Sequence, residues 1–128
     1  MASQIQKVQY EGYIGADPEL RYTPDGKPVC NFRLGSTNQY KNASGEVVKE
    51  TTWLKIATWG KLAEIVNAYC AVGSHVIVQG RLRPDENGSP SVYELKTGGH
   101  GASFEMTANE VRILSGKDKD AVTEDAPY

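Results

Sequence analysis

The sequence has 128 residues and a mass of 14.0 kDa, which is enough for one ordinary domain and too little for two independent cores of usual size. Hydrophobic residues make up 39% and charged residues 23%, with 13 glycines and 6 prolines, so the chain is of the soluble, turn-rich globular type and not collagen, coiled coil or wholesale disorder. The formal net charge of −2 excludes a polycation that binds nucleic acid by net charge alone.

Two strands are predicted in the first third of the chain. Residues 7–14 show the two-residue repeat of a half-buried strand. Residues 16–19 and 23–26 are rich in turn-forming types, so we expect the chain to bend at both places. A second strand is predicted over residues 29–37, and a hairpin loop over residues 42–45.

The third predicted strand, residues 48–59, sorts its side chains into two sets. One set consists of Thr52, Leu54, Ile56 and Thr58. The other consists of Lys49, Thr51, Trp53, Lys55, Ala57 and Trp59. Ammonium groups are costly to bury, so the set with the lysines is predicted to face outward. In the alternative, the faces are reversed and both indoles fill the core, since large aromatic side chains are usually buried.

The period then changes to that of a helix. The apolar stripe of this helix consists of Leu62, Ile65, Val66, Tyr69 and Cys70. The helix is predicted to end near Gly73, and a fourth strand is predicted over residues 75–82.

A long turn-rich stretch, residues 84–103, separates the fourth strand from the last. It contains a weak strand at residues 92–95 and a glycine run at residues 98–101 that we expect to be flexible. The last strand is predicted within residues 104–114. The order is therefore three strands, one helix and two strands.

This order predicts an all-β fold of the OB type, a five-stranded Greek-key barrel with one α-helix between strands three and four. Another barrel or a sandwich would also be all-β, but the place of the single helix favours the OB-fold. We expect the OB domain to occupy residues 1–116 and a short, acidic, flexible C-terminal tail to occupy residues 117–128.

Charge is unevenly distributed along the chain. Residues 20–61 contain seven basic and three acidic residues, whereas residues 84–110 contain one lysine and five acidic residues. One part of the surface is therefore able to attract an anion although the molecule as a whole is not.

Several functional classes find no support in the sequence. Cys30 and Cys70 form no C-x-x-C pair, so they are predicted to be buried thiols. His75 and His100 have no Cys, Ser or Asp at motif spacing, so we expect neither catalysis nor a metal or other cofactor. Without a membrane-length apolar run or a secretory signal, a cytoplasmic protein with no membrane contact is expected.

The outward set of the third strand suits unpaired nucleobases. Trp53 and Trp59 flank Lys55, and exposed indoles lower solubility unless they pack on something. A base offers a flat face for stacking, with a phosphate about one nucleotide away for Lys or Arg. A protein partner or a sister subunit could cover the same face instead, and RNA could be bound in place of DNA, so these alternatives stay open.

Three segments resemble bacterial single-stranded DNA-binding proteins. They are GYIGADPELRY at residues 12–22, followed by Gly26, Val29, Asn31 and Phe32; WGKLAE at residues 59–64; and GSHVIVQGRL at residues 73–82. The segments occur in the family's order and spacing over residues 4–83. The match weakens over residues 84–103 and recovers in the last predicted strand.

The resemblance implies an OB-fold homotetramer that binds single-stranded DNA without strict sequence preference in replication, repair and recombination, in the nucleoid, and performs no chemistry. It implies that Tyr40, Trp53 and Trp59 stack on bases. The basic residues that it would place along phosphates are Lys7, Arg21, Arg33, Lys41, Lys49, Lys55, Lys61 and Arg81.

The chain departs from the family's pattern in two places. The family usually has an aromatic residue in the hairpin after the fourth strand, where Tyr93 is the only nearby ring here. The family usually ends in a long linker and an acidic tip closing with Pro-Phe, which recruits genome-maintenance proteins. This chain has a short tail, and we expect its tip to bind replication and repair proteins. The tip consists of Glu124, Asp125, Ala126, Pro127 and Tyr128.

Overall fold

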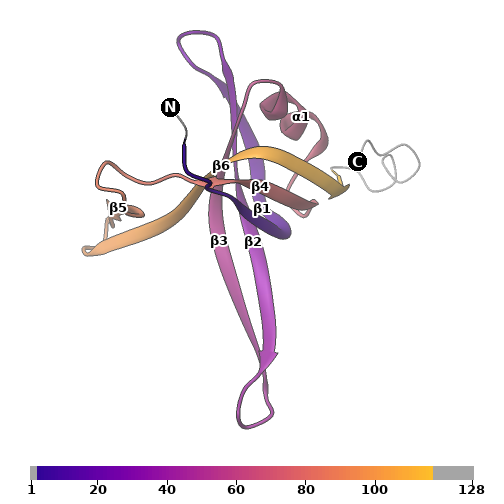
Figure 1. Ribbon diagram of the computed structural model, residues 1–128, viewed down its shortest axis with the longest axis vertical. Helices are drawn as coiled ribbons and strands as arrows, with labels where there is room; N and C mark the ends of the chain where they lie inside the picture. The colour runs from indigo at the N-terminus through magenta and orange to yellow at the C-terminus, as the bar shows by residue number, and fades with distance from the viewer. Residues whose placement is uncertain (1–2, 117–128) are drawn as a thin grey trace.

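The computed structural model describes residues 3–116, which form six strands and one helix (Figure 1). In chain order these are β1 (Val8–Tyr22), β2 (Pro28–Lys41), β3 (Val47–Trp59), α1 (Lys61–Tyr69), β4 (His75–Leu82), β5 (Ser91–Glu94) and β6 (His100–Ser115). The predicted all-β class, with one helix after the third strand, is confirmed. The predicted tail, residues 117–128 with the tip at 124–128, lies outside the described residues.

Five of these strands close a barrel. β1 pairs with β2 and β4, β2 pairs with β3, and β4 pairs with β6, all antiparallel. The parallel pairing of β3 with β6, from Leu54 opposite Phe104 to Ala57 opposite Thr107, completes the ring. β5 pairs with the first residues of β6, outside the ring. The prediction of five strands therefore describes the barrel alone. The weak strand expected at residues 92–95 is present as β5, an additional strand outside the barrel.

The bend predicted at residues 16–19 is wrong. β1 continues through these residues to Tyr22, with irregularities in its pairing to β2 between Ile14 and Ala16 and between Ala16 and Glu19. Proline has no N–H to donate to a strand ladder, so within a sheet it is confined to edges and bulges. The turn-forming residues here mark a bulge, whereas the bend predicted at residues 23–26 is present as a tight turn.

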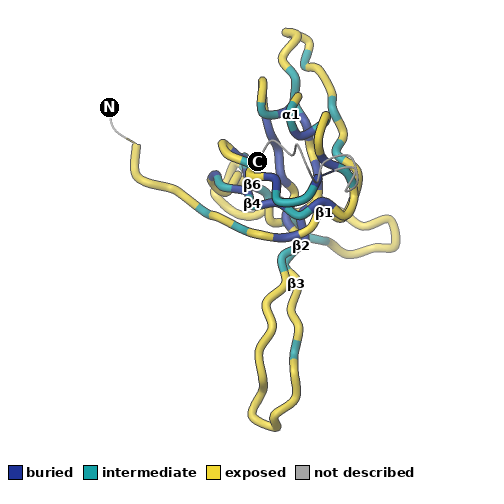
Figure 2. Tube along the Cα trace, turned by 90° about the vertical axis from the view of Figure 1, so that its right-hand side faces the viewer, coloured by how far each residue is buried: buried dark blue, intermediate teal, exposed yellow. Residues whose placement is uncertain are grey.

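β2 and β3 extend beyond the barrel as a long hairpin, whose residues 37–51 we call the arm. The arm is exposed along nearly its whole length, while buried residues gather in the body of the molecule (Figure 2). The loop predicted at residues 42–45 is confirmed, because the Asn42 side chain accepts hydrogen bonds from the backbone N–H groups of Ser44 and Glu46. The sequence places Tyr40 in the connection between the second and third predicted strands, but it lies within β2, which extends to Lys41.

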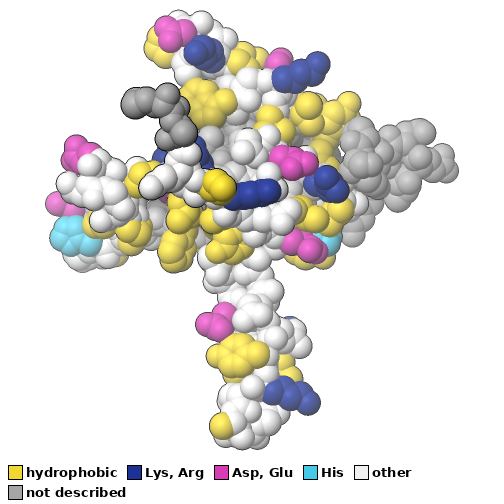
Figure 3. Space-filling model, viewed as in Figure 1, with side chains coloured by type: hydrophobic (Ala, Val, Ile, Leu, Met, Phe, Trp, Pro, Cys, Tyr) yellow, Lys and Arg dark blue, Asp and Glu magenta, His cyan; other side chains and the backbone are white. Residues whose placement is uncertain are grey.

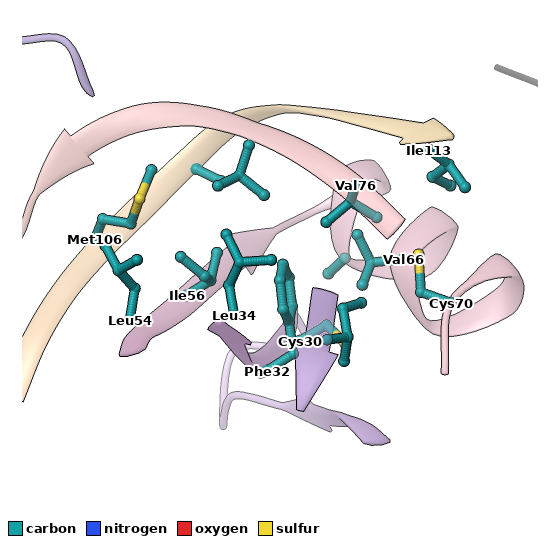
Figure 4. Close-up of a cluster of buried hydrophobic side chains, with 14 residues drawn as sticks. Cys30, Phe32, Leu34, Leu54, Ile56, Val66, Cys70, Val76, Met106 and Ile113 are labelled. Atoms are coloured by element: carbon teal, nitrogen blue, oxygen red, sulfur yellow. The ribbon is translucent and has the colours of Figure 1, made fainter. Parts of the chain in front are cut away.

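The core fills the barrel and the space between the barrel and α1 (Figure 4). Met106 and Leu54 lie at one end of this cluster, and Val66 of α1 lies toward the other. Cys30 is fully buried, and burial raises the pKa of its thiol to about 11, so this thiol stays protonated at neutral pH. Within residues 3–116, no helix has the length and apolar character that crossing a membrane requires.

We expect Leu34→Ala to lower the free energy of unfolding by about 2–5 kcal/mol, because Leu34 is fully buried and its loss leaves a cavity. The measurement is urea denaturation followed by circular dichroism. The control is Val47→Ala in the exposed arm, which should change stability by less than about 0.5 kcal/mol. Equal losses for both variants would contradict the assignment of Leu34 to the core.

Candidate nucleic-acid interface

β3 presents the two faces that the lysine argument predicts. Leu54 and Ile56 are buried in the barrel, whereas Trp53 and Trp59 each keep 45% of their surface exposed. The alternative with both indoles in the core is therefore wrong. Ala57 is an exception within the outward set, because it is buried at the point where β6 pairs alongside β3.

The indole of Trp53 rests on the backbone of two glycines. Gly35 lies directly opposite Trp53, and a Cβ added to Gly35 would come within 2.8 Å of the ring. A Cβ added to Gly15 of β1 would come within 2.5 Å of the same ring. The absence of both Cβ atoms lets the indole settle across β2 onto β1, supported by backbone. The guanidinium of Arg33 lies over this ring, 4.7 Å from its centroid.

Tyr93 repeats this arrangement on the β5–β6 hairpin. Its ring lies opposite Gly101, where an added Cβ would come within 2.5 Å of the phenol carbon Cζ. The ammonium of Lys55 reaches from β3 to within 5.4 Å of the Tyr93 ring centroid. Each ring therefore combines a glycine support with a nearby cation.

Both rings line one groove of about 530 Å³, which we call groove A. Groove A is lined by Arg33, Thr51, Thr52, Trp53, Leu54, Lys55, Tyr93, Ala102, Ser103 and Phe104. Two of these residues are basic and none is acidic. Arg33 and Lys55 lie directly opposite each other on β2 and β3. Like charges in this position repel, so a bound anion would stabilise the pair.

Two acidic residues of the segment after β4, Glu105 and Asp85, are engaged by their own neighbours. Burial of the Glu105 side chain opposes its ionisation, but hydrogen bonds from Ser91 and Arg83 and the charges of Arg83 and Lys55 outweigh this and hold the carboxyl pKa below its usual value. The Arg83–Glu105 ion pair spans 2.7 Å. Asp85 accepts hydrogen bonds from backbone N–H groups in its own loop. These carboxylates therefore repel an anion in groove A less than the excess of acidic residues over residues 84–110 indicates.

The two other predicted stacking residues, Tyr40 and Trp59, lie apart from groove A. Tyr40 is exposed on the arm, and its pairing with Val48 puts it on the face that Leu54 shares, opposite to the face of Trp53. Trp59 shares the face of Trp53 but lies six residues further along β3, about 20 Å away in an extended strand. The structure thus brings together Trp53 and Tyr93 and leaves Tyr40 and Trp59 outside.

The predicted basic residues are dispersed over the molecule. Arg33 and Lys55 line groove A, while the others lie at its margins or elsewhere on the chain. A hydrogen bond to Glu19 raises the pKa of Arg21, and the same carboxylate offsets its charge. The remaining ones are Lys7 before β1, Lys41 and Lys49 on the arm, Lys61 at the start of α1 and Arg81 on β4. Basic, acidic and hydrophobic side chains are interspersed over the face in Figure 3, including the arm.

The sequence interpretation missed two features of the site. Gly15 and Gly35 carried a usable signal, because a glycine inside a strand often marks a close approach to its backbone. Phe104 carried none, since it shares the phase of the buried Met106 and yet is 57% exposed at the edge of groove A. In the described part of the chain, no three His, Cys, Asp or Glu residues lie close enough to hold a metal ion.

The sequence profile of the Single-strand binding protein family matches residues 5–114. The chain belongs to this family. Single-stranded DNA-binding protein 1 of Chlorobaculum tepidum is 36% identical over 128 residues, which cover the whole of this chain and 76% of that protein. The single-stranded DNA-binding protein of Neisseria meningitidis is 33% identical over 124 residues, covering 97% of this chain and 67% of the relative. The resemblance found in the sequence is thereby confirmed, and the family consists of non-enzymatic DNA-binding proteins.

Two solved structures share the fold of this chain. The small single-stranded DNA-binding protein of Streptomyces coelicolor superimposes with a TM-score of 0.68 at 23% identity, covering 84% of this chain and 92% of that one. The Plasmodium falciparum SSB, solved in complex with ssDNA, gives a TM-score of 0.70 at 18% identity, covering 90% and 99%. These matches confirm the predicted OB-fold class.

We expect Gly35→Ala to destabilise the protein by about 1–3 kcal/mol, because the new Cβ forces the Trp53 ring off its support. In a Trp53→Ala background the same change should be neutral or slightly stabilising, since alanine restricts the unfolded chain more than glycine does. Urea denaturation of the four proteins of this double-mutant cycle tests the contact. Equal effects of Gly35→Ala in both backgrounds would refute it.

Proposed function

We propose that this chain binds and protects single-stranded DNA without strict sequence preference. Groove A carries the proposal, because Trp53 and Tyr93 each offer a backbone-supported ring with a cation beside it. A base has a π-face to stack on such a ring, and its phosphate suits Arg33 and Lys55. The names of the relatives support DNA as the ligand.

Binding in groove A would exchange one set of contacts for another. Arg33 lies over the indole of Trp53, and Lys55 is close to the ring of Tyr93. An incoming base competes with the two cations for the ring faces, while the phosphates of the DNA attract these cations. The side chains of Arg33 and Lys55 would therefore move from the rings to the phosphates. Every base has a π-face, and stacking contributes about 1–3 kcal/mol per base in single-strand binding proteins generally. Tolerance of sequence follows from this.

The remaining predicted residues would serve a strand longer than groove A. We assign base stacking to Tyr40 on the arm and to Trp59 at the other end of β3, with Trp53 and Tyr93 between them. The dispersed lysines and arginines would supply the salt-sensitive part of the affinity, because each neutralised phosphate releases counterions. On this basis residues 1–116 are the DNA-binding domain.

We also propose that the chain acts as a homotetramer. The outer face of β1 and β4 carries the exposed ring of Tyr13, which pairs with Gly35 of β2 and stacks on His75 with centroids 4.5 Å apart. His75 Nε2 lies 2.8 Å from a carboxylate oxygen of Glu11. The half-buried Ile77 continues this face, and such an ordered aromatic and apolar surface suits contact with a second copy.

The proposed place of action is the bacterial cytoplasm at the nucleoid, where replication, repair and recombination expose single strands. The tip at residues 124–128 would recruit proteins of these processes. Its acidic residues, proline and terminal tyrosine give a ring and carboxylates that a basic apolar pocket is able to receive.

We expect oligo-dT to quench the tryptophan fluorescence strongly, with added salt weakening the complex. Trp53→Ala should weaken the affinity about 5- to 100-fold, because one stacking contact is lost. The control is Tyr22→Ala, an exposed ring at the end of β1 outside groove A, which should bind as the parent does. Light scattering should give a tetramer for all three proteins. Unchanged emission at micromolar oligonucleotide would refute the proposal.

Deletion of residues 124–128 should leave the DNA affinity unchanged or slightly higher, because it removes negative charge that competes with DNA. The same deletion should abolish the capture of replication and repair proteins from a bacterial extract. A variant with Glu124 and Asp125 replaced by glutamine and asparagine is the matched control for charge alone. Partners that persist after the deletion would exclude the recruiting role.

A further inference from the structure

Phe104 lies at the junction of two grooves. Groove A ends at Ser103 and Phe104, and these two residues also line a second groove of about 530 Å³, which we call groove B. The other residues that line groove B are Gln6, Lys7, Val8, Leu82, Arg83, Pro84, Gly88, Ser89, Pro90 and Glu105. The phenyl ring therefore belongs to both.

The exposure of Phe104 is unusual for its position in the strand. Phe104 pairs with Leu54 and shares the phase of Met106, and both of these residues are buried. Phe104 keeps 57% of its surface exposed because β6 leaves the barrel at this point to pair with β5. Leu82, which lines groove B, is 52% exposed. An apolar ring held in this place by a parallel strand pair is available to a ligand.

The charges of groove B favour an anion on one of its walls. Of the residues that line it, Lys7 and Arg83 are basic and Glu105 is acidic. Arg83 and Glu105 pair at 2.7 Å, so the positive excess comes from Lys7, on the wall formed by the segment before β1. Asp85 lies in the loop between β4 and β5, where backbone N–H groups hold its carboxylate. A phosphate would therefore pass along the Lys7 wall.

We infer that Phe104 is a further base-stacking residue and that groove B extends the path of single-stranded DNA beyond groove A. This inference rests on the proposed function. The occupant is single-stranded DNA, because groove B is continuous with groove A through the shared Ser103 and Phe104, and because Lys7 supplies a cation beyond the ring. A base leaving Tyr93 or Trp53 meets Phe104 next.

The test uses oligo-dT of increasing length, from about 4 to about 16 nucleotides, the range of site sizes for one OB-fold. The full-length chain is compared with Phe104→Ala, Phe104→Leu and Phe104→Trp. The control is Val92→Ala, an exposed apolar residue of β5 that lines neither groove. Thermal unfolding of each variant checks the fold.

For the shortest oligonucleotides that bind, we expect the loss of affinity in the Phe104 variants to be smaller than for longer ones, because short strands occupy groove A, which Phe104 borders at one end only. Above a threshold length, Phe104→Ala and Phe104→Leu should bind about 5- to 100-fold more weakly, and Phe104→Trp should retain the affinity. Lys7→Gln should reduce the slope of log affinity against log salt concentration for the long oligonucleotides by about 1, the contribution of one phosphate contact.

Several results would overturn the inference. Equal loss at all lengths would make Phe104 a support of groove A, and no loss at any length would leave groove B to another ligand such as a peptide. If Phe104→Leu kept the full affinity for long oligonucleotides, Phe104 would act by apolar contact and not by stacking. If the parent chain bound oligo-dT at no length, the proposed function itself would fail, which is a different outcome from a failure confined to Phe104.

Discussion

The parallel pairing of β3 with β6 is the constraint on which the candidate interface depends. It closes the barrel between Leu54 and Ala57 on β3, and in doing so fixes where β6 leaves the barrel. The β5–β6 hairpin is thereby held beside the base of the arm, so that Lys55 reaches Tyr93. Without this pairing, the two glycine-supported rings would belong to separate hairpins. A contact of four residue pairs thus converts two exposed strands into one groove.

Electrostatics explain how an acidic protein carries a basic groove. Arg33 and Lys55 face each other across β2 and β3, an arrangement that is unfavourable by itself. Each lies near an aromatic ring, which offers a cation partial compensation. The carboxylate of Glu105, which pairs opposite Lys55, forms an ion pair with Arg83. The local field in groove A, rather than the net charge of −2, therefore decides which ligands are attracted.

Alternation in the sequence predicted the outward face of β3, because the period of a strand is local and lysine cannot be buried cheaply. Alternation could not predict that Tyr93 lies in the same groove as Trp53. Tyr93 is forty residues away in the sequence and reaches groove A only through strand pairing. The bend at residues 16–19 was wrong because a bulge and a turn use the same residue types. Phe104 was missed because its phase indicates burial, and only the departure of β6 from the barrel exposes it.

Glycine supports suit a ligand that is recognised by shape and not by sequence. A ring that rests on backbone gives up little conformational freedom when a base covers its other side, because the strands already fix its position. The cations keep long, mobile side chains and are able to follow phosphates of different geometry. The rigid rings thus suit contact with bases, and the mobile charged side chains suit contact with phosphates. In the proposed complex, the rings would set where bases lie, and the lysines and arginines would tolerate whichever path the DNA backbone takes between them.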